Sequence, residues 1–219
     1  TDKKFLTPIE KIPKRSDQMN EHGTEIKIGQ IREEHAKALR QKVKVKKKLG
    51  KIYGRILRER SISLLYNGEA CKPFSHCVWS ETRVKDTVQY GVVPAIIKID
   101  NLIDTKKYCK TCWIWLTPQD VACPNCKKTT DLLLRDRRVK GWIGVQRYFD
   151  SNHYGIDLIR NGRVIKELDK SFFSWENENE DLELEYPIDG FEKKGRIVGE
   201  IELDFVQVTH QKDAFVENS

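Results

Sequence analysis

The chain has 219 residues, a formal net charge of +7, 38% hydrophobic residues and 33% charged residues. This composition is typical of a globular protein with a modest core, and there is no apolar run of membrane-spanning length and no signal-peptide pattern. We therefore expect an intracellular protein, cytoplasmic or, in a eukaryote, nuclear, with no membrane partner. Because the first residue is Thr1, we expect a fragment or a processed chain of a longer protein.

The first part of the chain predicts a strand and then a helix. Residues of Thr24–Ile28 alternate between apolar and polar types after a glycine, which is typical of a strand. Apolar residues at i, i+3, i+4, i+7 and i+8 then predict a helix over 49–57. Within it Gly50 and Gly54 lie four residues apart, so a neighbouring segment could approach one helix face closely.

Positive charge is concentrated around this helix. Residues 37–60 contain 11 Lys and Arg and one acid, Glu59, a net charge of +10, so the rest of the chain sums to −3. Such a stripe fits an anionic partner such as nucleic acid, and it equally fits a solvated helix face. The candidate DNA contacts are Lys42, Lys44, Lys46, Lys47, Lys48, Lys51 and Arg55.

The middle of the chain predicts short strands. Alternation over 61–66 is followed by Asn67-Gly68, a turn signal, and 88–103 is another strand-rich apolar stretch. A compact cysteine-containing insertion interrupts the sheet pattern, which resumes with a strand at 142–148.

The last part of the chain also predicts sheet. Asn161-Gly162 indicates a hairpin within 154–165, because both turn residues of this type need positive φ. Residues 197–205 alternate like a half-buried strand. The acidic stretch 174–185 is expected to be a loop, and 208–215 a loop that runs into a helix.

Four of the six cysteines form two Cys-x-x-Cys pairs ten residues apart: Cys109, Cys112, Cys123 and Cys126. Two such knuckles supply the tetrahedral thiolate shell that zinc prefers, and a shell of four thiolates leaves no position for water. The sequence therefore predicts a zinc ribbon with one structural zinc ion, which would replace a core that so short a segment cannot build.

Two redox pairs or an iron site are the alternatives to zinc. A redox Cys-x-x-Cys usually opens a helix in a βαβ unit, and that pattern is missing here. Trp113 and Trp115 are expected to pack the ribbon, and Cys71 and Cys77 to be buried thiols. Lysines flank the ribbon, so it could bind nucleic acid or protein, but we favour a purely structural insertion.

Several segments, in this order, resemble parts of the GHKL ATPases, the superfamily of gyrase B, MutL, the heat-shock chaperones and the microrchidia proteins. The first is similar to the glycine-threonine strand that ends the nucleotide-binding domain. The others are similar to the helix and strand that lead into the transducer domain, and to microrchidia-type transducer segments. The segments are 22–28, 49–57 with 62–68, and 155–163 with 195–204 and 208–215.

The resemblance implies roles for three residues. In the family the threonine of the glycine-threonine strand helps to hold adenine, here Thr24. A transducer lysine reaches the terminal phosphate of ATP, here Lys212, with Gln211 beside it. From pattern alone Thr24 is better explained as a plain strand residue. For Lys212 we favour the phosphate contact over a solvated lysine, because such a lysine must lie on a short, defined loop.

The resemblance also implies a fold class and a domain order. The class is α+β: an α/β transducer-like sheet with helices on one face and the inserted zinc ribbon. ATP and Mg would be cofactors of the full-length parent, which is expected to be a homodimer, with its own upstream ATPase segment and DNA as partners. The expected segments are 1–30 (end of the nucleotide domain), 31–60 (basic connecting helix), 61–104 and 131–219 (transducer) and 105–130 (ribbon).

The family's catalytic acid-and-asparagine helix and its Asp-x-Gly-x-Gly loop are not found in this sequence. We therefore expect the chain to be the rear part of an ATPase, which alone neither hydrolyses ATP nor binds it tightly. A non-enzymatic zinc-ribbon module that binds nucleic acid or protein is the alternative. A self-contained hydrolase or transferase is disfavoured, because no nucleophile elbow, P-loop or catalytic metal pattern is present.

Overall fold

A computed structural model describes residues 26–184 and 195–216. The chain divides into two units, Thr1–Arg40 and Gln41–Ser219, and each is described by itself. The boundary falls inside the segment 31–60 that the sequence predicts as one basic connecting helix. None of the described helices has the length and apolar character that a bilayer-spanning helix needs.

The first unit contains one described helix, α1 (Glu33–Arg40). Acids in its first turn and cations in its last turn oppose the helix dipole, and Arg40 lies 3.3 Å from Glu33. The predicted strand does not form over its described part, where Ile26 and Ile28 are exposed in irregular backbone, because no described residue of this unit pairs with it. Thr24 lies outside the described residues.

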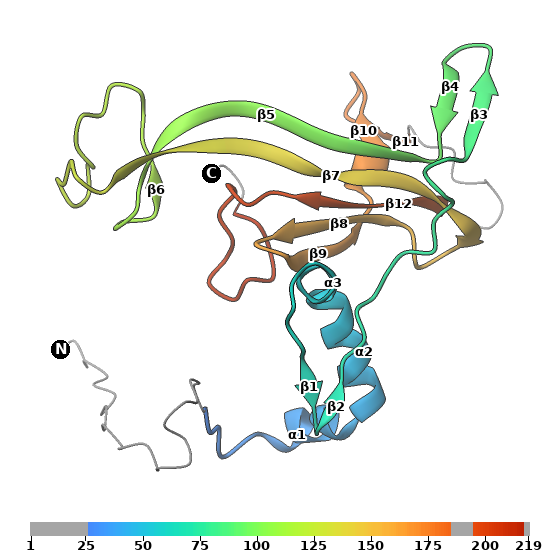
Figure 1. Cartoon of the computed structure of the whole chain (residues 1–219), viewed down its shortest axis with the longest axis horizontal. Helices are drawn as coiled ribbons and strands as arrows, with labels where there is room; N and C mark the ends of the chain where they lie inside the picture. Colours follow the sequence, from blue (N-terminus) through green and yellow to red (C-terminus); the bar gives the residue numbers. More distant parts are fainter. Residues whose placement is uncertain (1–25, 185–194, 217–219) are drawn as a thin grey trace. The chain divides into compact units, whose positions relative to one another are not determined.

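The second unit is mixed α/β, with few helices and a curled sheet (Figure 1). Its helices are α2 (Lys42–Ile52), α3 (Gly54–Glu59) and the short 3-10 helix η2 (Ser171–Phe173). Its strands are β1 (Leu65–Tyr66), β2 (Glu69–Ala70), β3 (Val84–Thr87), β4 (Gly91–Pro94), β5 (Ile96–Cys109), β6 (Ile114–Trp115), β7 (Leu132–Asp150), β8 (Gly155–Arg160), β9 (Arg163–Asp169), β10 (Ser174–Glu176), β11 (Leu182–Leu184) and β12 (Gly195–Glu202).

Six strands form the main sheet in the order β6-β5-β7-β12-β8-β9. Among the described strands of this sheet, β12 and β8 pair in parallel and the other neighbouring strands pair antiparallel. The long strands β5 and β7 continue beyond the other strands as a curved two-stranded arm, and the cysteine segment lies at its end (Figure 1). The topology therefore holds the cysteines away from the centre of the sheet.

The main core lies on β8 and β12. Ile156 and Val198 are 1% and 0% exposed, and Phe173 of η2 packs against them in the same cluster. Burying an aliphatic or aromatic side chain of this size stabilises the fold by roughly 1.5–3 kcal/mol. The C-terminal segment joins this core through Phe215, which packs against the cluster.

Strand β12 corrects the expectation of a half-buried strand. In a half-buried strand the polar residues face solvent, so Glu200 is expected to be exposed. In the structure it is only 5% exposed. Arg58 of α3 donates two hydrogen bonds of 2.7 Å to its carboxylate, and Arg55 lies 3.6 Å from it. The polar face of β12 is therefore covered by α3, and the two arginines of this helix compensate the buried carboxylate.

The structure confirms the turn predicted at Asn67-Gly68 and the hairpin predicted at Asn161-Gly162. Asn67 and Gly68 have φ of 49° and 78°, and Asn161 and Gly162 have φ of 50° and 77°. Both residues of each turn thus adopt the left-handed conformation that Asn and Gly tolerate best. They connect β1 to β2 and β8 to β9.

Two segments differ from the sequence-based prediction. The predicted acidic loop forms the hairpin β10–β11, because the Asn177 side-chain oxygen accepts hydrogen bonds from the Asn179 and Asp181 backbone N–H groups. The predicted C-terminal helix is missing from the described residues up to Val216. There the Thr209 hydroxyl accepts from the N–H of Asp213, which favours a turn over a helix.

The predicted helix over 49–57 is confirmed, with one interruption at Tyr53 between α2 and α3. The close approach expected at its glycines is also confirmed. A Cβ on Gly50 would overlap the Lys72 carbonyl oxygen, and the Gly50 carbonyl accepts a 2.9 Å hydrogen bond from the Phe74 N–H.

We predict that Gly50→Ala lowers the free energy of unfolding by about 1–3 kcal/mol, although Ala favours helix by about 1 kcal/mol. Its Cβ meets backbone, which cannot move aside without losing the hydrogen bond to Phe74. Gly54→Ala is the matched control, because its Cβ would lie 3.2 Å from the flexible Arg58 side chain and from the Phe74 carbonyl oxygen. Denaturant unfolding of both variants checks this, and equal stabilities would contradict it.

Candidate metal centre and associated sites

The four predicted cysteines meet at the end of the β5–β7 arm. The Sγ atoms of Cys109, Cys112, Cys123 and Cys126 all lie within 4.8 Å of one another. The Cys109 and Cys126 sulfurs are 3.7 Å apart, which is close to the edge of about 3.8 Å expected for a tetrahedron with metal–sulfur bonds of about 2.3 Å. This cluster could hold a metal ion.

Local backbone geometry positions these sulfurs. Cys109 is the last residue of β5, and the Cys112 N–H points at its sulfur at 3.4 Å. The Lys127 N–H donates to the Cys123 carbonyl at 2.8 Å, and Lys127 has φ of 60°. Each Cys-x-x-Cys therefore forms a tight turn that brings both of its sulfurs to one point.

The crowding of the sulfurs perturbs their titration. The neighbouring Cys126 thiol raises the pKa of Cys112 to about 12. The Cys126 backbone N–H lowers the pKa of Cys123 to about 7. The raised pKa means that the Cys112 thiol resists deprotonation, and a bound cation would relieve the repulsion between thiolates.

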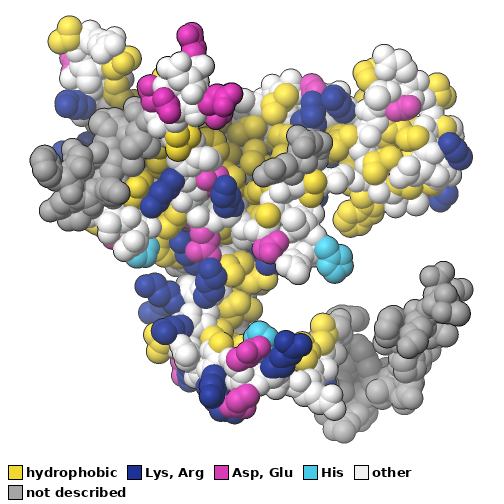
Figure 2. All heavy atoms as spheres, turned by 180° about the vertical axis from the view of Figure 1, so that it is seen from behind, with side chains coloured by type: hydrophobic (Ala, Val, Ile, Leu, Met, Phe, Trp, Pro, Cys, Tyr) yellow, Lys and Arg dark blue, Asp and Glu magenta, His cyan; other side chains and the backbone are white. Residues whose placement is uncertain are grey.

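The ribbon has a small core. Cys109 and Cys123 are fully buried with Leu116, and Ile114 and Leu132 pack against them. The prediction that both tryptophans pack the ribbon is wrong for Trp113, which has φ of 61° and is 69% exposed. In Figure 2 apolar side chains are accordingly visible on the surface of this lobe.

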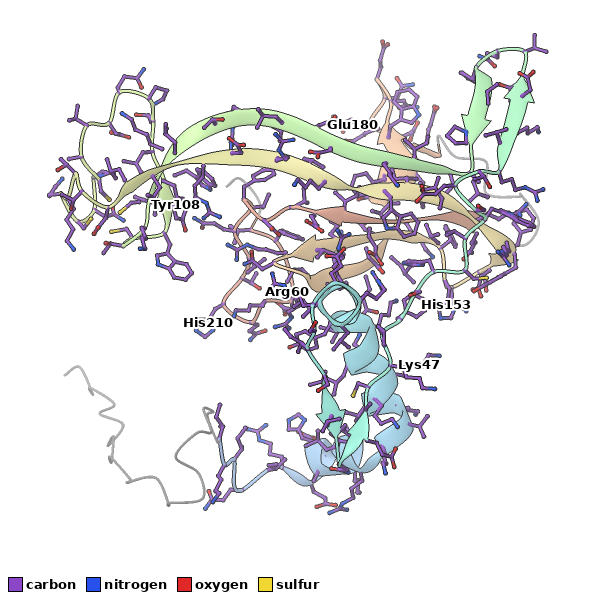
Figure 3. All side chains as sticks on the ribbon, in the orientation of Figure 1. Lys47, Arg60, Tyr108, His153, Glu180 and His210 are labelled. Carbon is purple, nitrogen blue, oxygen red and sulfur yellow. The ribbon has the colours of Figure 1, made fainter. Side chains whose placement is uncertain are left out.

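Trp115 ties the ribbon to the main sheet. Its indole N–H donates to the Phe205 carbonyl at 3.0 Å, and its ring stands edge-on to the ring of Tyr108 at 5.0 Å. The Arg135 guanidinium lies 4.8 Å from the centre of the Tyr108 ring. Tyr108 is labelled near the base of the ribbon in Figure 3. The ribbon is therefore attached by more than its two strands.

The remaining cysteines lie apart from the cluster. Cys71 is buried, as expected, whereas Cys77 is exposed, so the prediction of a buried thiol is wrong there. The Cys77 carbonyl pairs with the Arg147 N–H, which holds its backbone beside β7 while the side chain stays accessible.

Gln211 and Lys212 lie in an exposed turn near the C-terminal end of the described chain. Lys212 has φ of 57°, a left-handed conformation that is uncommon for a residue with a Cβ. A bridge between Val208 and Phe215 closes the loop, and the Lys212 N–H donates to the Thr209 carbonyl at 2.9 Å. The labelled neighbour His210 marks this turn in Figure 3.

Most of the candidate DNA contacts on α2 and α3 are paired with carboxylates. Glu69 contacts Lys42 and Lys46, whose ammonium groups hold its pKa at about 2. Glu167 lies beside Lys48 and Lys51.

Arg55 of the same helical segment lies 2.7 Å from Glu59 and 2.6 Å from Glu202. Lys44 and Lys47 are exposed and make no ion pair with any described residue, and Lys47 points away from its helix (Figure 3). The DNA contacts remain a prediction, and these two lysines are the candidates best placed for it.

One buried pair, His76 and Asp157, could not be predicted from any motif or spacing. The side chains of His76 and Asp157 are 4% and 3% exposed, with Nε2 and Oδ2 separated by 3.1 Å. The Asp157 carboxylate also accepts a hydrogen bond from the Leu168 N–H at 2.7 Å. The Phe74 and Trp142 rings flank the imidazole. Because the pair joins the 71–78 segment to β8, we assign it a structural role.

Comparisons with known proteins leave the family open. No family model matches the chain, and a comparison with curated proteins finds no match. The resemblance to GHKL ATPases therefore stays a prediction that rests on the sequence segments named above.

Proposed function

We propose that the four clustered cysteines bind one structural zinc ion. The observation that carries this proposal is the set of four sulfurs within 4.8 Å of one another, two of them from fully buried cysteines. Zinc favours four thiolates in a tetrahedron, and no ligand position remains for water or substrate. The ion would therefore stabilise the ribbon, and it would take no part in a reaction.

We further propose that the chain is the coupling region of a GHKL-type ATPase, with a transducer-like sheet and its helices on one face. The observation in favour is the Lys212 turn. A lysine that contacts a phosphate must lie on a short, defined loop, and this turn is closed by the Val208–Phe215 bridge and by the hydrogen bond from the Lys212 N–H to the Thr209 carbonyl. The short loop supports the position of Lys212 that the resemblance implies.

The turn could pass a change at Lys212 to the sheet. The Thr209 hydroxyl bonds to the Asp213 carboxylate at 2.6 Å, which fixes the loop, and Phe215 anchors its far side against the main core. An ammonium group here is a mobile point charge suited to a terminal phosphate. When that contact is lost after hydrolysis, the turn is released and the core beside Phe215 can move.

We predict that mixing the chain with the segment encoded upstream of it in the parent gene produces ATP turnover, and that Lys212→Gly lowers it by about 100-fold or more. Glycine suits the positive φ, so this variant removes the ammonium group without straining the loop. Lys127→Gly is the matched control, because Lys127 is also an exposed lysine, with φ of 60°. Steady-state phosphate release gives the rates.

Two results would count against the ATPase proposal. One is a folded upstream segment that gives no turnover in any mixture, and the other is an equal loss of rate for Lys212→Gly and Lys127→Gly. The chain would then be a non-enzymatic zinc-ribbon module that binds nucleic acid or protein. That alternative draws support from Lys110 and Lys127 on the ribbon, which have no ion-pair partner among the described residues.

A further inference from the structure

Residues of β3, β4 and their neighbours line a groove. The β3–β4 hairpin lies at the end of β5 opposite the cysteine segment (Figure 1). The volume of the groove is 560 Å³, within the range of roughly 300–1,000 Å³ found for small-molecule sites. We call it the hairpin groove. Its lining includes Trp79, Arg83, Lys85, Tyr90, Val93 and Arg196.

The charged side chains that line the hairpin groove are all positive. Two arginines and one lysine line it, and no described Asp or Glu does. Arg83 and Lys85 have no carboxylate partner among the described residues, and the neighbouring Glu81 is paired with Lys98 at 2.9 Å. Asp86 of β3 is not among the residues that line the groove, whereas its chain neighbours Lys85 and Thr87 are. A groove of this kind attracts an anion.

The guanidinium groups are held in place by aromatic rings. The Arg83 guanidinium lies 3.9 Å from the centre of the Trp79 ring, and Arg147 lies 5.4 Å from the same ring. Arg196 lies 4.7 Å above the Phe149 ring. Stacking keeps the N–H groups of an arginine in a fixed plane, ready to bind a phosphate through two hydrogen bonds.

Tyr90 supplies an accessible aromatic face beside these cations. It is 72% exposed in the β3–β4 turn, where its N–H donates to the Thr87 hydroxyl at 3.1 Å. Exposed aromatic rings beside a positive groove are the arrangement that binds single-stranded nucleic acid, because bases stack on the rings while cations follow the phosphates. In a duplex the bases are already stacked on one another and unavailable to Tyr90.

We propose that the hairpin groove binds single-stranded nucleic acid, with Arg83 and Lys85 on phosphates and Tyr90 stacked on a base. The site is separate from the lysines of α2 and from the zinc ribbon, and it does not depend on the ATPase proposal. An acidic protein would satisfy the cations but would leave the aromatic face without a role.

Fluorescence anisotropy with labelled dT20, rU20 and a 20-base-pair duplex tests this on the whole chain. We expect a single strand to bind more tightly than the duplex, and Tyr90→Leu to weaken that binding by about 5- to 150-fold, while Tyr90→Phe retains it. Arg83→Gln/Lys85→Gln should lower the slope of log affinity against log salt by about 1.4, since each phosphate contact contributes about 0.7.

Lys72→Gln/Lys140→Gln is the matched control for charge, because both lysines are exposed and neither lines the groove, and it should leave single-strand affinity within about twofold of the native value. Thermal unfolding of each variant shows that it is folded. The proposal is overturned by three results: no binding of either single strand, equal losses in the control, or polyglutamate that binds as tightly as the oligonucleotides. The last result would point to an acidic protein partner.

Discussion

Replacing Cys109 by Ser is expected to unfold the ribbon and to release its metal, while the main core stays folded. Binding of zinc by four cysteines supplies roughly 10–16 kcal/mol of apparent free energy in small zinc domains, and the ribbon core contains few apolar side chains. The main core on β8 and β12 is a separate cluster. Limited proteolysis between residues 109 and 132 reports whether the ribbon is folded, and thermal unfolding reports whether the main core is folded.

Cys77→Ser is the matched control for this prediction, because Cys77 is exposed and lies outside the cluster. It should keep both the metal and the protease resistance of the ribbon. A strong chelator should reproduce the effect of Cys109→Ser on the native chain. A ribbon that stays protease-resistant after complete metal removal would contradict the structural role proposed for the ion.

Replacing Glu200 by Gln is expected to lower the free energy of unfolding by about 3 kcal/mol, at the low end of the range for breaking a buried ion pair. The carboxylate is buried beneath α3 and accepts both hydrogen bonds from Arg58, so its loss leaves a cation without its charged partner. The decrease in the free energy of unfolding is limited because Arg55, the other arginine beside Glu200, keeps Glu59 and Glu202 as partners. Urea unfolding measures the change.

The control for Glu200 is Glu81→Gln, whose ion pair with Lys98 is exposed on both sides. Exposed pairs contribute about 0–1 kcal/mol, so this variant should differ little from the native chain. If the two variants had the same stability, the buried cluster beneath α3 would contribute no more than a surface pair.

Features set by local chemistry could be predicted from the sequence. The turns at Asn67-Gly68 and Asn161-Gly162 follow from the conformations that these residues tolerate, and the close approach at Gly50 follows from its missing side chain. The cysteine cluster belongs to the same class, because the spacing within each pair nearly fixes its geometry. The mixed α/β class and the helix over 49–57 were also predictable.

Features set by distant partners could not be predicted. The burial of Glu200 depends on Arg58, which is 142 positions away in the chain, so alternation alone placed it in solvent. In the sequence the lysines of α2 form a basic stripe without acidic partners, because the acids that pair with them, Glu69 and Glu167, lie outside the helix. The hairpin groove likewise combines Trp79 and Arg83 with Arg196, which is more than 100 positions further along the chain.

The C-terminal turn shows how a local hydrogen bond can override a helical expectation. Thr209 accepts from backbone N–H groups of the following residues, and the bridge between Val208 and Phe215 closes the loop before a helix can begin. A pattern that includes Thr209 and Asp213 is compatible with either a helix start or a turn. Packing of Phe215 against the core favours the turn.

The most direct test of the metal centre is X-ray absorption at the zinc edge, combined with metal analysis of the purified chain. We predict one zinc ion per chain with four sulfur ligands at about 2.3 Å. A shell that contains nitrogen or oxygen, iron in place of zinc, or a metal-free chain with disulfides within each Cys-x-x-Cys pair would contradict the proposal.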